Sequence, residues 1–278
     1  MKRLALVCLL LSTLAVPSLF ADDKQPPDLN ALPDLIVSDT LGSQWVVREE
    51  NLAASFCSVE EGHVTPGYRK LIRFTVTTPN IGAGDVYVGD PNVHVANNDG
   101  LFEFAECHNH YHFRHYAKYE LIDPKTGYSW RAAKRGFCML DTDPNPAWLG
   151  EPAGPSYFHS CGAIGIPGNQ GISHGWADTY RFFLGGQYFI LDGGDGQPVV
   201  PPGNYILRIT VNPPFVGSKS EPCRALDTKT GLCHQFAETD YSNNSRDAIV
   251  QIPDHPGRGG VGPLKDTKPL GYEPAEHQ

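Results

Sequence analysis

The amino-acid sequence predicts an all-β protein, with a β-sandwich core, long irregular loops and little helix. Short runs of β-branched and aromatic residues recur along its 278 residues, with Gly, Pro, Asn and Asp between them, and this pattern is typical of a sandwich. No apolar pattern of helical period continues for three turns. The stretches 141–175 and 213–235 have the composition of loops, and loops of such length are often functional.

The predicted strands follow one another from residue 34 to residue 252. Asp34-Leu35-Ile36-Val37 begins the folded part, and residues 204–211 have the clearest strand composition. We expect hairpin turns at residues 123–127 and at Gly185-Gly186, because these residues favour turns. The other expected strands are 45–48, 71–77, 86–88, 106–113, 115–123, 128–130, 180–184, 187–191 and 248–252.

The first 21 residues have the features of a secretory signal peptide. Lys2 and Arg3 precede an apolar run that ends at Phe20, and Ala21 stands before two aspartates. The run is too short for a membrane span, and no other stretch is apolar enough, so we expect a secreted or periplasmic protein without a transmembrane segment. A buried N-terminal helix is the alternative interpretation.

After the signal peptide we expect a polar, proline-rich linker over 22–33, a folded region over 34–252 and a loosely ordered tail over 253–278. About 257 residues can bury a full hydrophobic core, and one large β domain fits this length as well as two.

The chain is acidic. Loss of Lys2 and Arg3 with the signal peptide changes the formal charge from −9 to −11. A negative charge argues against nucleic acid as a partner and favours cationic substrates; acidity that serves only solubility is the alternative.

An even number of cysteines in an exported chain predicts disulfides. Six remain after the signal peptide: Cys57, Cys107, Cys138, Cys161, Cys223 and Cys233. Their number leaves the pairing open, and metal ligation by cysteine is the rival interpretation.

Three histidines alternate along the sequence at His108, His110 and His112. On a β-strand they would point to one face, where neutral imidazoles can bind a metal and leave coordination positions open. A flat strand would separate the first and last by about 13 Å, whereas metal–nitrogen bonds are about 2 Å. The strand must therefore bend or twist. Imidazole suits Zn, Cu, Fe and Ni, so the spacing alone names no metal, and three unrelated histidines are the alternative.

A second cluster carries oxygen atoms. Glu238, Asp240, Asn243 and Asn244 lie within seven residues, and hard oxygen ligands suit Ca²⁺. The spacing is not that of an EF-hand, and local Asx turns explain the same residues.

Several blocks of the chain resemble the lysyl oxidase family, and they occur in the family's order from about Asp34 to Ile252. The blocks are Cys107-His108-Asn109-His110-Tyr111-His112, Lys134-Arg135-Gly136-Phe137-Cys138-Met139-Leu140-Asp141-Thr142, Gly171-Ile172-Ser173, Asp178-Thr179-Tyr180, Pro202-Gly203-Asn204-Tyr205-Ile206-Leu207 with Val211-Asn212-Pro213, and Asp240-Tyr241-Ser242-Asn243-Asn244. The resemblance implies a lysyl oxidase-like catalytic domain over 34–252.

The resemblance implies copper at the three histidines and a lysine tyrosylquinone cofactor formed from Lys134 and Tyr180. It implies an amine oxidase that converts primary amines, either lysine side chains of proteins or small amines, to aldehydes with O₂, releasing ammonia and hydrogen peroxide. Asp178 is our candidate for the catalytic base, with a structural hydrogen bond as the alternative. Animal family members have a histidine where this chain has Lys118, so any role of that histidine does not transfer.

The resemblance also implies a structural calcium ion held by the oxygen cluster together with Asp34 and the Leu35 carbonyl. Asn243 begins a glycosylation sequon, but a calcium ligand cannot readily carry a glycan. This chain has fewer cysteines than the animal proteins. By position we expect the pairs Cys57–Cys107, Cys138–Cys161 and Cys223–Cys233.

Two other functions compete with an amine oxidase. An exported, non-catalytic copper-binding protein would need the three histidines but neither Lys134 nor Tyr180. A zinc or non-haem iron enzyme on a β-sandwich would use the same histidines.

Overall fold

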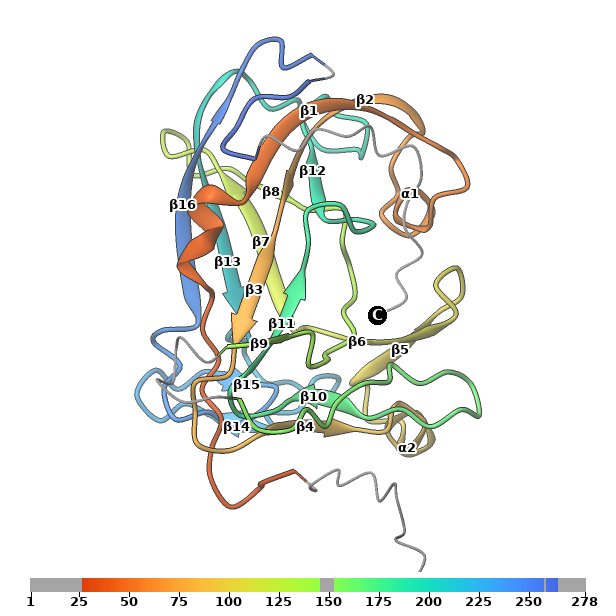
Figure 1. The fold of residues 1–278 in the computed structure, drawn as a ribbon, viewed down its shortest axis with the longest axis vertical. Coiled ribbons are helices and arrows are strands. Elements are labelled where there is room, and N and C mark those ends of the chain that lie inside the picture. Colours follow the sequence, from red (N-terminus) through yellow and green to blue (C-terminus); the bar gives the residue numbers. More distant parts are fainter. Residues whose placement is uncertain (1–26, 146–152, 258, 265–278) are drawn as a thin grey trace, which may run out of the picture.

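The computed structural model describes residues 27–145, 153–257 and 259–264 (Figure 1). The signal peptide predicted over 1–21, the first part of the linker and residues 265–278 of the predicted tail lie outside the described residues.

The all-β prediction is confirmed, and two sheets form the sandwich. One sheet has the order β16 (Ser245–Ile252), β13 (Gly203–Val211), β7 (Ala117–Ile122) and β8 (Ser129–Arg131). The other has the order β1 (Trp45–Leu52), β2 (Gly67–Phe74) and β12 (Tyr188–Ile190). Side chains of both sheets belong to one buried core. Phe74 of β2 meets Tyr119 of β7 with ring centroids 5.3 Å apart, so the sheets pack face to face.

Strand β13 illustrates how the sequence builds this layer. Tyr205, Leu207, Ile209 and Val211 are buried, whereas the residues between them are not, because successive side chains of a strand point to opposite faces. Each fully buried aliphatic side chain contributes roughly 1.5–3 kcal/mol of transfer free energy.

In the described residues, four small sheets and three short helices accompany the sandwich (Figure 1). The sheets pair β3 (Val76–Pro79) and β9 (Asp143–Pro144) with β11 (Trp176–Tyr180), β4 (Val86–Gly89) with β10 (Gln170–Ile172), β5 (Phe102–Ala105) with β6 (His110–Phe113), and β14 (Ala225–Leu226) with β15 (Cys233–His234). The helices are η1 (Asp39–Ser43), α1 (Cys57–Glu61) and α2 (Pro91–Asn97).

One predicted turn is confirmed and the other is wrong. Strands β7 and β8 pair directly around the turn at residues 123–127. The expected hairpin at Gly185-Gly186 does not form, because β11 pairs with β3 and β12 pairs with β2. Residues 181–184 are not a strand; instead the Arg73 guanidinium donates to the carbonyls of Phe182 and Leu184. A side chain from the sandwich thus replaces strand pairing there.

The three expected disulfides are confirmed. They join Cys57 to Cys107, Cys138 to Cys161 and Cys223 to Cys233.

The described part of the predicted tail packs on the edge of β1. Val261 exchanges both backbone hydrogen bonds with Val47, and Leu264 donates to the Trp45 carbonyl.

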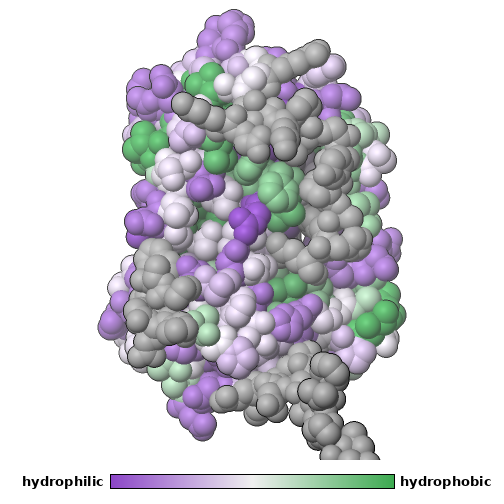
Figure 2. Space-filling model, in the orientation of Figure 1, coloured by the Kyte–Doolittle hydropathy of each residue, from purple (hydrophilic) through white to green (hydrophobic). Residues whose placement is uncertain are grey.

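On the visible face, hydrophilic and hydrophobic residues are interspersed (Figure 2). Within the described residues, none of the helices combines the length and the apolar character needed to cross a bilayer.

A buried ion cluster supports the second sheet. Glu50 lies 2.8 Å from the Nε of Arg48 and accepts hydrogen bonds from Nε and Nη2 of Arg73, and all three residues are almost fully buried. Because the same Arg73 holds the carbonyls of residues 182 and 184, this cluster connects the core of the sandwich to the loop after β11.

Replacing Glu50 with Ala should lower the free energy of unfolding by about 3–5 kcal/mol, because it leaves two guanidinium groups buried side by side. The matched control is Asp247→Ala, which removes a half-exposed ion pair with Arg208 and should cost less than about 1 kcal/mol. Urea unfolding of the two variants measures the difference, and equal losses would contradict this account of the cluster.

Candidate metal and cofactor site

The three histidines lie on a hairpin and not on a single strand. Residues 106–109 form the turn between β5 and β6, so His108 lies in the turn, whereas His110 and His112 lie on β6. The Asn109 backbone donates to the Ala105 carbonyl at 2.8 Å and has a left-handed φ of 55°, a conformation that asparagine tolerates well. The expected strand over 106–113 is therefore confirmed for residues 110–113 and wrong for residues 106–109, and the turn provides the bend that a shared metal would require.

The turn gathers the three imidazole rings. Their centroids lie 5.6, 5.2 and 4.9 Å apart. Rings that share one ion through bonds of about 2 Å have centroids roughly 5 Å apart, so the spacing fits a shared metal. Among the described residues, however, no group of three or more His, Cys, Asp or Glu side chains is already arranged to hold an ion.

Gly136 allows the backbone to approach His112. A Cβ atom at this glycine would lie 2.3 Å from the Nδ1 atom of His112, far inside van der Waals contact. The next residue, Phe137, accepts a hydrogen bond from the Phe113 backbone at 2.6 Å. The segment that carries Lys134 thus lies directly against β6.

Lys134 and Tyr180 come together although 46 positions separate them in the sequence. The Nζ atom of Lys134 lies 4.6 Å from the centroid of the Tyr180 ring. The Tyr180 hydroxyl donates to the Cys138 carbonyl at 2.7 Å and accepts from the Cys138 backbone N–H at 2.8 Å. The ring is buried and fixed at its far end, and the amine lies over its face.

A narrow cavity of about 20 Å³ joins these groups to the histidines. Its lining is His110, His112, Lys134, Cys138, Cys161, Tyr180 and Leu184. A second cavity of about 10 Å³ is lined by residues that include His108, His112, Lys134 and Glu61. Lys134 and His112 line both cavities, so the predicted metal ligands and the predicted cofactor residues belong to one place in the fold.

Asp178 is fully buried on β11. It precedes Tyr180 by two residues, so both side chains point to the same face of the strand. Burial raises the pKa of the Asp178 carboxyl well above its usual range, while the positive charge of Lys134 acts in the opposite direction. Asp178 does not line either of the two cavities, but the charge of Lys134, which lines both, acts on its carboxyl.

The predicted oxygen cluster also assembles. Glu238 is buried and accepts hydrogen bonds from the Leu35 backbone and from the Asn212 and Asn244 amides. Asn243 donates to Asp34 at 2.9 Å. The predicted Asx turn forms as well, since the Ser242 backbone donates to Asp240.

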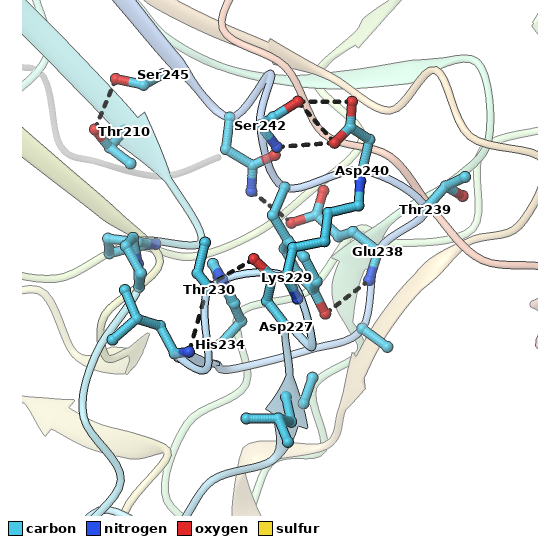
Figure 3. A pocket seen from close by; sticks show the side chains of 18 of the residues that line it. Thr210, Asp227, Lys229, Thr230, His234, Glu238, Thr239, Asp240, Ser242 and Ser245 are labelled. Atoms are coloured by element: carbon cyan, nitrogen blue, oxygen red, sulfur yellow. Dashed lines mark hydrogen bonds between the residues drawn. The ribbon is translucent and has the colours of Figure 1, made fainter.

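Two carboxyls of this cluster have raised pKa values, whereas hydrogen bonds from Ser242 lower the pKa of Asp240. Burial raises the pKa of Glu238 to about 7, and the charge of Asp34 contributes in the same direction. Burial also raises the pKa of Asp34, as does the charge of Asp240. Glu238, Asp240 and Ser242 lie at one side of a groove of about 790 Å³, whose lining also includes Asp227 and His234 (Figure 3). Carboxylates this close to one another favour a bound cation.

Sequence reasoning missed two residues of the site. Gly136 has its role only because the His112 ring approaches it, and Glu61 lies 2.8 Å from the Nδ1 atom of His108. The sequence feature that could have identified Glu61 is its position four residues after Cys57, because residues four apart share one face of a helix.

Comparisons with known proteins identify relatives of this chain. The lysyl oxidase family model matches residues 40–222, a range that includes the histidines, Lys134 and Tyr180. Lysyl oxidase homolog 2 from Gallus gallus is 30% identical over 228 residues, covering 76% of this chain and 23% of that protein. Lysyl oxidase homolog 4 from Homo sapiens is 27% identical over 231 residues, covering 78% of this chain and 24% of that protein. The chain spans about a quarter of the length of these relatives.

Gly136→Ala should lower the free energy of unfolding by about 1–3 kcal/mol, because the new methyl group overlaps the His112 ring and forces it or the backbone to move. Gly42→Ala is the control, since nothing lies within 4 Å of a Cβ atom there. Thermal unfolding of both variants tests this, and a Gly136→Ala protein as stable as the wild type would disprove the close approach.

Proposed function

The chain belongs to the lysyl oxidase family, and from that premise we propose that it oxidises primary amines with copper and a lysine tyrosylquinone cofactor. The overall reaction consumes the amine, O₂ and water and releases an aldehyde, ammonia and hydrogen peroxide. The observation that carries the proposal is the position of the Lys134 amine, 4.6 Å from the centre of the Tyr180 ring. A protein that only binds copper has no need of this pair.

His108, His110 and His112 would hold the copper ion. The spacing of their rings supports this set, and imidazole is a suitable ligand for copper. When present, copper and the quinone supply the one-electron steps, the reaction with O₂ and the electrophilic carbonyl that binds an amine. The protein contributes position, because Lys134, Tyr180 and two of the histidines line the same cavity.

Lys134 and Tyr180 would form the cofactor by a bond from Nζ to a carbon of the ring, which replaces a ring C–H bond and an amine N–H bond. Two molecules of O₂ would be the oxidant: they supply the second oxygen atom of the ring and are otherwise reduced to water and hydrogen peroxide. The amine already lies over the ring, so side-chain movement suffices to bring the atoms together. The two hydrogen bonds to Cys138 hold the Tyr180 hydroxyl, and the Cys138–Cys161 disulfide braces that segment. These contacts keep the ring in place while the lysine reaches it.

Asp178 would act as the base that removes a proton from the α-carbon of the bound amine. Enzymes tune the pKa of a catalytic carboxyl upward by burial, and burial raises the pKa of Asp178 above its usual range. Asp178 and Tyr180 share one face of β11, which supports this role.

The substrate class follows from charge. The formal net charge of −9 favours cationic amines, either small amines or lysine side chains of proteins, and disfavours nucleic acid. Three disulfides suit a secreted or periplasmic location.

A structural calcium ion would complete the fold at the other predicted site. Asp34, the Leu35 carbonyl, Glu238, Asp240, Asn243 and Asn244 are the proposed ligands. Backbone and side-chain hydrogen bonds already join the start of the domain to the segment before β16, and a cation there would neutralise the clustered carboxylates.

Copper-loaded wild-type protein should stain for quinone and release peroxide from primary amines. Intact mass should show a Lys134–Tyr180 crosslink. Lys134→Arg and Tyr180→Phe should abolish the mass change and reduce peroxide release to background, because no quinone forms. Lys118→Arg, on an exposed side chain of β7, is the matched control and should retain activity. Copper-loaded wild-type protein with neither quinone nor peroxide release would rule out the oxidase.

Calcium should raise the stability of the wild-type protein by about 2.7 kcal/mol when its concentration is a hundred times the dissociation constant. Glu238→Gln should remove most of this gain, because it deletes a charged oxygen ligand. Glu103→Gln, which alters a half-exposed carboxylate on β5, should keep the gain. Denaturant unfolding with calcium and with chelator measures it; a gain that persists in Glu238→Gln would exclude this cluster as the site.

A further inference from the structure

Helix α1 is held against the histidine turn from two sides. The Cys57–Cys107 disulfide links its first residue to the residue before His108. On its other side Val59 is buried in a small apolar cluster, and the Ser58 hydroxyl lies 2.7 Å from the hydroxyl of Tyr188. Figure 1 shows α1 above the end of the β5–β6 hairpin. The helix is therefore a fixed support beside the turn.

This support presents a carboxylate to one of the predicted metal ligands. Glu61 follows Cys57 by four residues, so the two side chains share a face of the helix. The Oε2 atom of Glu61 lies 2.8 Å from the Nδ1 atom of His108, and their side chains are 27% and 8% exposed. Glu61 also lines the small cavity that His108, His112 and Lys134 share. The neighbouring Glu60 is exposed, which makes it a natural control.

His108 differs from the other two histidines in what holds it. His110 and His112 lie on the paired strand β6, whereas His108 lies in the turn, next to the left-handed Asn109. The contact with Glu61 reaches His108 from outside the hairpin, on a helix tied to the turn by a disulfide. A carboxylate at Nδ1 favours the tautomer that keeps the proton there, which leaves Nε2 with its lone pair for a metal.

We propose that Glu61 is a positioning residue for His108, which keeps the proton on Nδ1 and directs Nε2 to the metal shared with His110 and His112. The proposal rests on the proposed copper site but has a consequence for the metal-free protein. The Cys57–Cys107 disulfide holds both partners of the contact, because Glu61 shares a helix with one cysteine and His108 follows the other.

The first test needs no metal. Nitrogen NMR of metal-free protein with ¹⁵N-labelled histidine rings should show His108 protonated at Nδ1. In Glu61→Gln, the signals of His108 should shift, whereas those of His110 and His112 should change little. In Glu60→Gln all three should remain as in the wild type. A His108 ring protonated at Nε2 in the wild type overturns the proposal, and this result requires no variant to fold.

The second test measures copper affinity by competition with a chelator. Glu61→Gln should bind Cu²⁺ 10–100-fold more weakly than the wild type, as is typical when the outer partner of a ligand histidine is lost, and Glu60→Gln should match the wild type. Equal copper affinity in Glu61→Gln and the wild type overturns the proposal. If amine oxidation is nevertheless lost at equal affinity, Glu61 contacts the substrate instead of positioning His108. A wild type that binds no copper defeats the proposed function, while the nitrogen signals still decide whether Glu61 orients His108.

Discussion

The arrangement of the site depends on one extended segment, residues 133–138, and on the hydrogen bonds that hold it. The backbone N–H groups of Ala133 and Lys134 donate to the carbonyls of Tyr188 and Gly186. The Phe137 carbonyl accepts from Phe113 of β6, and Cys138 exchanges two bonds with the Tyr180 hydroxyl of β11. The segment therefore fixes three parts of the chain at once. It joins Lys134, which it carries, to Tyr180 on β11 and to the histidines of the β5–β6 hairpin.

Buried carboxylates in this protein are compensated in three different ways. Glu50 lies between two guanidinium groups, and Glu238 accepts hydrogen bonds from three N–H donors. At Asp178 the positive charge of Lys134 favours the ionised carboxylate, against the effect of burial. A buried carboxylate is costly unless it is paired or hydrogen-bonded. The pairing at Glu50 serves the fold. The raised pKa values at Glu238 and Asp178 mark groups whose charged form still lacks full compensation, which is typical of sites that bind or react.

Much of the fold and of the candidate site was predictable from the sequence, and the failures have physical reasons. Alternation along residues 204–211 identified β13, and the position of the cysteines identified the disulfides. The strand prediction for 106–113 failed because turn formation at 106–109 overrides the β propensity around it. The hairpin at Gly185-Gly186 failed because its flanking strands pair with partners about a hundred residues earlier, and local turn chemistry holds no information about such pairing.

The sequence by itself determined which residue types the site contains, because ligand chemistry depends on side-chain identity and the order of the motifs is written in the chain. The residues alone predicted the histidines and the oxygen cluster, whereas Lys134 and Tyr180 were predicted only from the resemblance to the lysyl oxidase family. Tertiary structure alone decided that Lys134 lies over the Tyr180 ring, that Gly136 makes room for His112 and that Glu61 faces His108. These are contacts between residues far apart in the chain, and their distances depend on how sheets and disulfides pack, which no local pattern specifies.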